Sequence, residues 1–163
     1  MSDPVTLRSV QASADIARLE AALHALSLEL GEIYATDPAT LQHALTGPQP
    51  SAQALLAVQG GQTLGAALFS PVFSTVRGAA GVYVSDLWVS AEARGQGLGA
   101  RLLAQIARQG AATWQARWLK LAVYDHSLEA QKFYKRLGFE RAEGAQEMRL
   151  GAEAVAQLVK RAG

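Results

Sequence analysis

The chain has 163 residues, which suffice for one domain with a hydrophobic core and are too few for two ordinary domains. Half of the residues are hydrophobic and 18% are charged, a composition that argues against disorder. The absence of cysteine excludes disulfides, thiolate metal sites and a cysteine nucleophile. The net charge of +1 argues against nucleic acid as a partner, and the three scattered histidines lack the spacing of a zinc site, so no metal is expected.

Capping and turn residues divide the chain into short elements. Asp37 followed by Pro38 predicts the start of a helix, the Gly60-Gly61 pair predicts a hairpin turn, and Gly138 predicts a helix end. In chain order, we predict a strand over 5–10, helices over 13–30 and 38–47, strands over 54–58, 63–69 and 82–89, a helix over 98–115, a strand over 118–124, a helix over 127–138, one or two strands over 139–150, and a final amphipathic helix. The order β-α-α-β-β-β-α-β-α-β is typical of a mixed α/β sheet with helices on both faces.

The strand over 82–89 changes the parity of its apolar residues partway. Two valines at its start share one face, whereas Leu87 and Val89 have the opposite parity. A slip of one residue around Ser85 and Asp86 would restore the pattern, so we predict a β-bulge there. A strand that is buried on both faces would give the same pattern.

Residues 94–100, RGQGLGA, follow this strand and open the next helix; we call them the glycine loop. Three alternate glycines leave the backbone N–H groups accessible, and the N-terminus of a helix attracts anions. Residues 92–141, which include Arg94, carry nine Lys and Arg against four Asp and Glu, whereas residues 1–90 carry three against seven. The loop is therefore predicted to hold a phosphate group, although a solvated helix face would explain the basic residues equally well.

Three segments together resemble the GCN5-related N-acetyltransferases. They are YVSDLWV at 83–89, RGQGLG at 94–99 and FYKRLGF at 133–139. The glycine loop matches the family signature of Arg or Gln, two residues, Gly, one residue, and Gly or Ala. The resemblance covers most of the chain and implies an acyl-CoA N-acyltransferase fold in one domain over 1–163, with a splayed central sheet. Within the family, the sequences of the motifs are most similar to those of diamine acetyltransferases.

The resemblance implies acetyl-CoA as the co-substrate. Its pyrophosphate would bind the amides of Gly95 to Ala100, its pantetheine arm would pair with the backbone of Leu87 and Val89, and the bulge would expose an N–H group to the thioester carbonyl. Ser127 stands where many relatives have an Asn that contacts the cofactor, so it would donate one hydrogen bond to the cofactor or else cap its helix. The predicted cofactor-binding residues are Leu87, Trp88, Val89, Arg94, Gly95, Gln96, Gly97, Leu98, Gly99, Ala100, Ser127 and Tyr134.

The resemblance also implies direct attack by an amine, without a covalent enzyme intermediate. Tyr134 would protonate the departing CoA thiolate as the general acid. Diamine acetyltransferases have a Glu where this chain has Ser85, which leaves Asp86 as the predicted base, acting directly or through a water. Further candidates for the base are Glu29, Glu32 and His126.

The predicted acceptor is a primary amine of a small molecule, bound by Glu29, Glu32, Trp88 and Tyr124. The carboxylates would attract a cationic amine and Trp88 would add a cation–π contact, although a solvated acidic helix end would explain the same carboxylates. Family members are often homodimers, and residues 148–160 are a candidate contact. No signal peptide and no run of membrane-spanning length is evident, so we expect a cytoplasmic protein without a membrane partner.

Two other functions stay open. A non-catalytic acetyl-CoA sensor would keep the glycine loop and tolerate the departures at Ser85 and Ser127. A dinucleotide-binding protein is the second, because residues 95–100 also fit the pattern G-x-G-x-x-A after a strand and before a helix. Against it, that loop normally belongs to the first βα turn, whereas some 80 residues precede it here.

Overall fold

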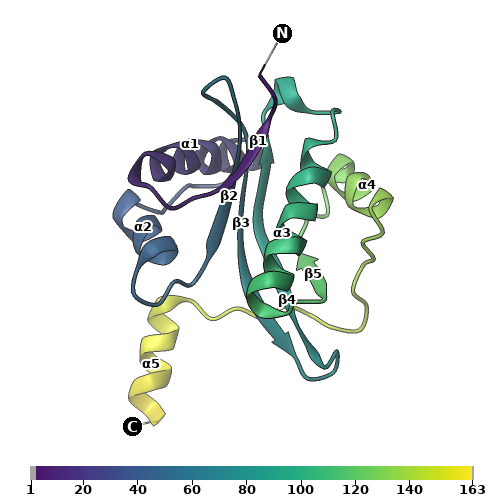
Figure 1. Ribbon diagram of the computed structural model, residues 1–163. Helices are drawn as coiled ribbons and strands as arrows, with labels where there is room; N and C mark the ends of the chain where they lie inside the picture. Colours follow the sequence, from purple (N-terminus) through teal and green to yellow (C-terminus); the bar gives the residue numbers. More distant parts are fainter. Residues whose placement is uncertain (1–2, 163) are drawn as a thin grey trace. The chain divides into compact units, whose positions relative to one another are not determined.

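The computed structural model of the protein describes residues 3–162 (Figure 1). The chain forms two compact units that divide between Tyr124 and Asp125. The elements of the first unit are β1 (Thr6–Ser9), α1 (Ser13–Leu30), α2 (Pro38–Thr46), β2 (Gln53–Gln59), β3 (Gln62–Ser74), β4 (Ala79–Val89), the 3-10 helix η1 (Ala91–Ala93), α3 (Leu98–Trp114) and β5 (Trp118–Leu121). Those of the second unit are α4 (Leu128–Arg136) and α5 (Ala152–Ala162).

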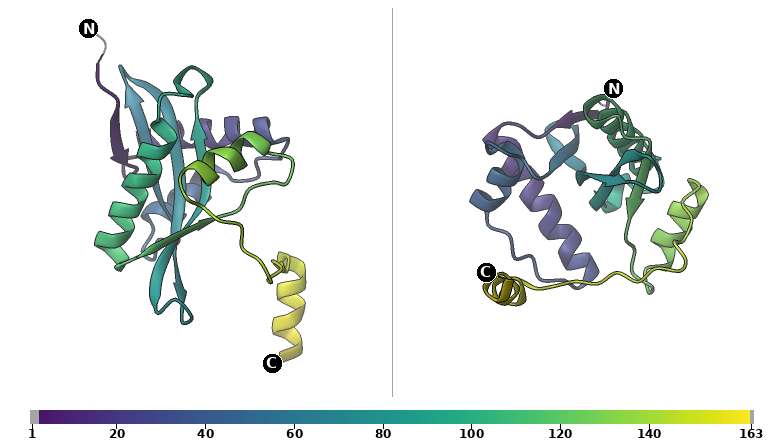
Figure 2. Two further views of the ribbon diagram at one scale, coloured as in Figure 1. Left: turned by 90° about the vertical axis from the view of Figure 1, so that its right-hand side faces the viewer. Right: turned by 90° about the horizontal axis from the view of Figure 1, so that it is seen from below.

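The strands of residues 3–162 form one mixed sheet in the order β1-β2-β3-β4-β5. Neighbours are antiparallel from β1 to β4, whereas β5 runs parallel to β4. Helices α1 and α2 lie on one face of this sheet and α3 on the other (Figure 2). The mixed α/β fold and the predicted order of elements up to α4 are therefore confirmed.

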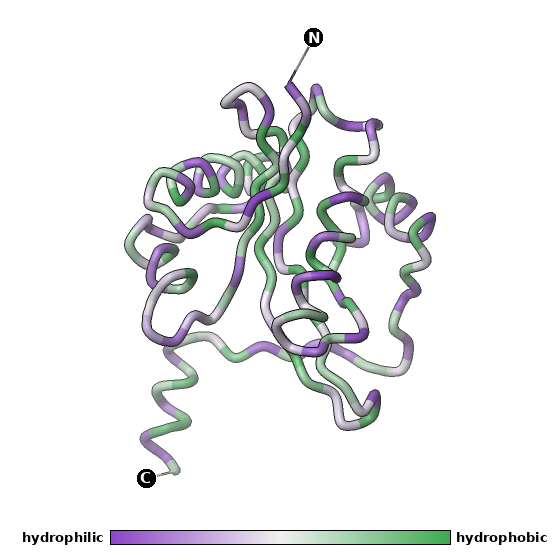
Figure 3. The backbone as a smooth tube through the Cα atoms, viewed as in Figure 1, coloured by the Kyte–Doolittle hydropathy of each residue, from purple (hydrophilic) through white to green (hydrophobic). Residues whose placement is uncertain are grey.

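Each face of the sheet has its own core. On one face, Leu19 and Leu23 of α1 pack with Leu56 of β2. On the other, Gly110 lets α3 approach β4 closely, because a Cβ at this position would lie 2.4 Å from Cγ2 of Val82. Apolar residues are concentrated along the central strands, whereas the helices alternate between apolar and polar residues (Figure 3).

The predicted bulge in β4 is confirmed. Asp86 pairs with Leu68 and Val84 pairs with Phe69, so that Ser85 is the extra residue of the strand. The Ser85 hydroxyl donates a hydrogen bond to the Leu68 carbonyl at 3.1 Å. This extra residue explains the parity change in the sequence, because it turns Leu87 and Val89 to the face that Val84 occupies.

The sheet opens on the far side of the bulge. β5 pairs with β4 only from Gly81 to Val84, opposite Trp118 to Leu121. Within residues 3–162, β3 is the one strand that pairs with β4 beyond that point. One edge of residues 86–89 is therefore open, which is the splay expected of the central sheet.

Turns and caps lie where the sequence predicts them. The Asp37 carboxylate accepts the Thr40 N–H at 2.9 Å and caps α2. Gly60 and Gly61 have φ angles of 53° and 79°, as the tight β2–β3 hairpin requires. Gly138 has φ of 92° just after α4.

The strand predicted over 139–150 is wrong. Within residues 3–162, the segment 139–151 has neither helix nor strand, and only Phe139 in it is even half-buried. Its charged residues give it no apolar face to bury, and Gly144, with φ of 76°, interrupts any extended run. The segment joins α4 to α5, whose large apolar side chains Val155, Leu158 and Val159 are exposed.

Candidate functional site

The glycine loop leaves backbone donors open at the start of α3. Gly95 and Gly97 both have φ of 76°, and a Cβ at either position would meet nothing within 4 Å. Gly97 is the N-cap of α3 and has no side chain to accept the first N–H groups of the helix. Leu98 points into the core with 4% exposure, so only its backbone is available to a ligand. The loop therefore fits an anionic group such as a pyrophosphate.

The open edge of β4 lies just before this loop in the chain. Leu87 and Val89 pair with Ala67 and Gly65 of β3. Within residues 3–162, β5 has ended its pairing before this level, so the other edge of the strand can accept an extended ligand. The bulge at Ser85 lies at the point where the edge becomes free.

Two carboxylates, Glu32 and Asp86, form the centre of an acidic group that we call the carboxylate pair. Burial raises the pKa of Asp86 and the charge of Glu32 raises it further, while the polar side chain of Ser85 partly opposes both effects. Glu32 accepts a hydrogen bond from the Tyr124 hydroxyl. Neither carboxylate forms an ion pair with any group of residues 3–162. The pair thus presents negative charge that a cationic amine would balance.

Tyr34 is a member of this group that sequence reasoning missed. Its hydroxyl is buried and has no hydrogen-bond partner within residues 3–162. Burial raises the pKa of Tyr34, and the charges of Glu20, Asp86 and Asp37 add to the shift. Tyr34 lies in the segment between α1 and α2, which also supplies Glu32. This proximity in the sequence is the signal that could have identified Tyr34.

Glu29 belongs to a different set of contacts. Its carboxylate accepts the Trp88 indole N–H at 3.3 Å and lies 2.6 Å from Nη2 of Arg94. Arg94 also donates from Nε to the Val89 carbonyl at 3.0 Å. The structure therefore brings Glu29 and Trp88 together, as predicted for acceptor binding, but balances the charge of Glu29 with Arg94.

The second unit carries the remaining predicted residues. Tyr134 lies on the last turn of α4, with its ring centroid 5.1 Å from Phe133 and 5.5 Å from Phe139. Burial raises the pKa of Tyr134. Ser127 is the N-cap residue of α4, but its side chain makes no capping hydrogen bond. Ser127 thus occupies the predicted N-cap position, although its hydroxyl accepts no hydrogen bond from the first turn of the helix.

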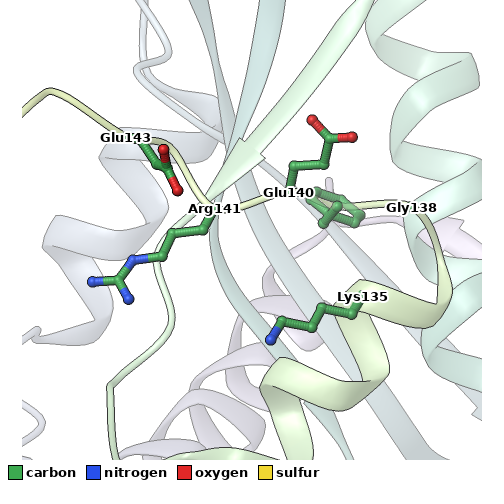
Figure 4. A pocket seen from close by; sticks show the side chains of 6 residues that line it. Lys135, Gly138, Glu140, Arg141 and Glu143 are labelled. Carbon is green, nitrogen blue, oxygen red and sulfur yellow. The ribbon is translucent and has the colours of Figure 1, made fainter.

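A broad hollow of about 680 Å³ is lined by a separate set of residues in the second unit, namely Lys135, Gly138, Phe139, Glu140, Arg141 and Glu143. It contains none of the predicted site residues. Its charged side chains diverge instead of converging on one point (Figure 4). We therefore assign it no role.

Two kinds of feature are absent from residues 3–162. The described His, Asp and Glu side chains do not gather in any group of three or more that could hold a metal ion. Among the described helices, none has both the length and the apolar character needed to cross a membrane.

The fold and the loop together define an α/β protein in which a helix N-terminus without a side-chain cap follows a splayed sheet. Solved structures with the same architecture are found by structural comparison. The integron cassette protein VCH_CASS6 from the mobile metagenome of V. cholerae superposes with a TM-score of 0.77 at 23% identity, covering 96% of this chain and 98% of that one. Ribosomal-protein-alanine N-acetyltransferase from Brucella melitensis biovar Abortus 2308 superposes with a TM-score of 0.72 at 19% identity, covering 90% and 100%. At these identities the likeness establishes the fold.

Comparison by sequence gives the family. The model of the acetyltransferase (GNAT) family matches residues 19–139, and the chain therefore belongs to this family of acetyl-transferring enzymes. Thialysine N-epsilon-acetyltransferase from Sus scrofa is 33% identical over 103 residues, which make up 61% of this chain and 59% of the relative. The chain thus spans about three-fifths of the length of the curated relatives that it matches. The family predicted from the three motifs is confirmed.

Proposed function

We propose that the protein transfers the acetyl group of acetyl-CoA to a primary amine of a small molecule. The observation that carries this proposal is the uncapped glycine loop, which follows a bulged strand with one open edge. A phosphate-bearing ligand with an extended arm fits both features, and family membership supports CoA as that ligand.

The chain's own groups would bind the donor in two stretches. The amides of Gly95 to Ala100 would hold the pyrophosphate, with Arg94 and Gln96 at its edge, and the backbone of Leu87 to Val89 would pair with the pantetheine arm. Ser127 would donate one hydrogen bond to the cofactor, a role supported by the observation that its hydroxyl makes no capping hydrogen bond in α4. When bound, acetyl-CoA supplies an activated acyl group, and the strand N–H exposed at the Ser85 bulge would polarise its carbonyl.

The carboxylate pair would bind the acceptor. Glu32 and Asp86 supply negative charge, Tyr124 supplies aromatic surface beside Glu32, and Trp88 supplies aromatic surface beside Glu29. The similarity to thialysine N-epsilon-acetyltransferase, whose name specifies an amine of a lysine analogue, supports a cationic amine as the acceptor.

The reaction needs one proton acceptor and one proton donor. The amine nitrogen attacks the thioester carbon, a C–N bond forms, and the C–S bond breaks. Asp86 would take the proton from the amine, and its raised pKa makes it a stronger base than an ordinary carboxylate. Tyr134 would give its proton to the CoA thiolate and regain one from water. Its role is supported by its place in the 133–139 motif and by burial, which raises the pKa of the phenol and keeps it protonated at neutral pH.

A thioester-cleavage screen tests the proposal. The purified protein is mixed with acetyl-CoA and with thialysine, lysine, polyamines, aminoglycosides or peptides, and both free CoA thiol and acetylated amine are measured. We expect release of CoA matched by acetylation of at least one small amine. Binding of acetyl-CoA without transfer to any amine would favour a sensor, and absence of binding would overturn the proposal.

A further inference from the structure

Arg94 is already bound by groups of the chain itself. Its Nη2 lies 2.6 Å from Oε2 of Glu29, and its Nε donates to the Val89 carbonyl at 3.0 Å. A guanidinium is a forked, charged donor that suits a phosphate as well as it suits a carboxylate. Glu29 therefore holds the one cationic side chain that the glycine loop carries within its own sequence.

Glu29 comes from the end of α1 and is held from two sides. Its Oε1 accepts the Trp88 indole N–H at 3.3 Å while Oε2 contacts Arg94. The Arg94 and Glu29 side chains are 51% and 45% exposed, so water and dissolved anions reach the ion pair. Ion pairs with such exposure are weak and exchange readily.

We propose that Glu29 is an internal competitor for Arg94, which gives up the guanidinium when the pyrophosphate of CoA enters the glycine loop. The inference rests on the proposed function, because it takes CoA as the ligand of the loop. A pyrophosphate carries more negative charge than one carboxylate and accepts hydrogen bonds from the loop amides as well as from Arg94, so it displaces Glu29. The exchange makes CoA binding weaker than it would be without Glu29, and it leaves the carboxylate free beside Trp88.

A double-mutant cycle on CoA binding, measured by calorimetry, tests the exchange. Glu29→Gln removes the charge of the competitor and keeps its shape, so we expect CoA to bind about threefold more tightly, as the loss of a weak exposed pair implies. Arg94→Gln should weaken binding about tenfold, and in that background Glu29→Gln should have no further effect.

Glu92 provides the matched control. It lies two residues before Arg94 and accepts a hydrogen bond from Gln62, so Glu92→Gln removes a nearby negative charge without touching Arg94. Its effect on CoA binding should be the same with Arg94 or Gln at position 94.

Each remaining outcome is decisive. An equal effect of Glu29→Gln in both backgrounds would overturn the exchange and leave CoA as the ligand. Weaker CoA binding by Glu29→Gln would also overturn it, because Glu29 would then help Arg94 to bind the ligand. Failure of the wild-type protein to bind CoA would overturn the proposed function itself, and this inference with it.

Discussion

Asp86 is a carboxyl group whose ionised form is disfavoured by the fold. Burial raises its pKa and Glu32 adds to the shift. Because the folded pKa lies above the unfolded one, the contribution of Asp86 to stability is present below the unfolded pKa and is lost as pH rises through the folded pKa. Asp86→Asn should therefore raise the free energy of unfolding at pH 7 by about 1 kcal/mol, as replacement of a destabilising functional residue commonly does. The same substitution should abolish acetyl transfer.

Urea unfolding of the wild type and of Asp86→Asn at pH 7 and at about pH 3.5 measures the difference in stability. The stability gained by the variant should disappear at the lower pH. Asp37→Asn is the control of opposite sign. Hydrogen bonds from Thr40 lower the pKa of Asp37, so its stabilising contribution is present above the unfolded pKa and is lost as pH falls. A variant of Asp86 that is less stable than the wild type at pH 7 would contradict the prediction.

Tyr134 is tested by removing only its hydroxyl. Tyr134→Phe keeps the ring contacts with Phe133 and Phe139. It should lower kcat at least about 100-fold, which is the lower end of the range for loss of a general acid, and leave CoA affinity unchanged. Because burial raises the pKa of the phenol, the loss of wild-type rate from its ionisation should begin at a higher pH than for an ordinary tyrosine. Tyr83→Phe removes the same group from β4 and should leave kcat as it is.

At the scale of the element, we predict that donor binding depends on the glycine loop. Gly97→Ala puts a side chain at φ of 76°, where space is open but the left-handed backbone is strained by about 1 kcal/mol. The shifted amides should weaken CoA binding roughly tenfold, or about 1.4 kcal/mol. Gly78→Ala is the matched control, because Gly78 has φ of 61° and equally open space in the β3–β4 hairpin.

Thermal unfolding and calorimetry of the two glycine variants separate strain from binding. Both variants should lose similar stability, and only Gly97→Ala should lose CoA affinity. If the two bind CoA equally, the loop amides do not hold the ligand.

Elements whose ends are set by local chemistry could be predicted from the sequence. The Asp37 cap, the Gly60-Gly61 turn and the parity change at Ser85 each depend on a few neighbouring residues, and each lies where predicted. Strand ends depend on partners distant in sequence. β4 begins at Ala79, earlier than predicted, because Gly81 leaves room for the ring of Trp118. A Cβ at position 81 would lie only 2.3 Å from that ring. The strands predicted over 139–150 do not form, because this segment is rich in charged residues and has no apolar face to pair and bury.

At the scale of the whole molecule, the family and the order of elements follow from motifs, but the partners of individual charges do not. Glu29 and Glu32 are three residues apart, and the sequence treats them as equivalent acceptor-binding candidates. In the fold, Glu29 faces Arg94 whereas Glu32 faces Tyr124. The reason is that these contacts span 65 and 92 residues of the chain, so only the packed sheet determines them.

The homodimer suggested by the resemblance is a prediction for the whole molecule. α5 carries exposed Val155, Leu158 and Val159, a spacing that places them on one helical face, so a second copy of the chain would gain by covering it. Light scattering should give a mass twice that of the 17.2 kDa chain. Leu158→Asp should yield the single-chain mass, whereas Gln157→Asp, a neighbouring polar position, should leave the dimer intact. A wild-type protein of 17.2 kDa in solution would contradict the homodimer.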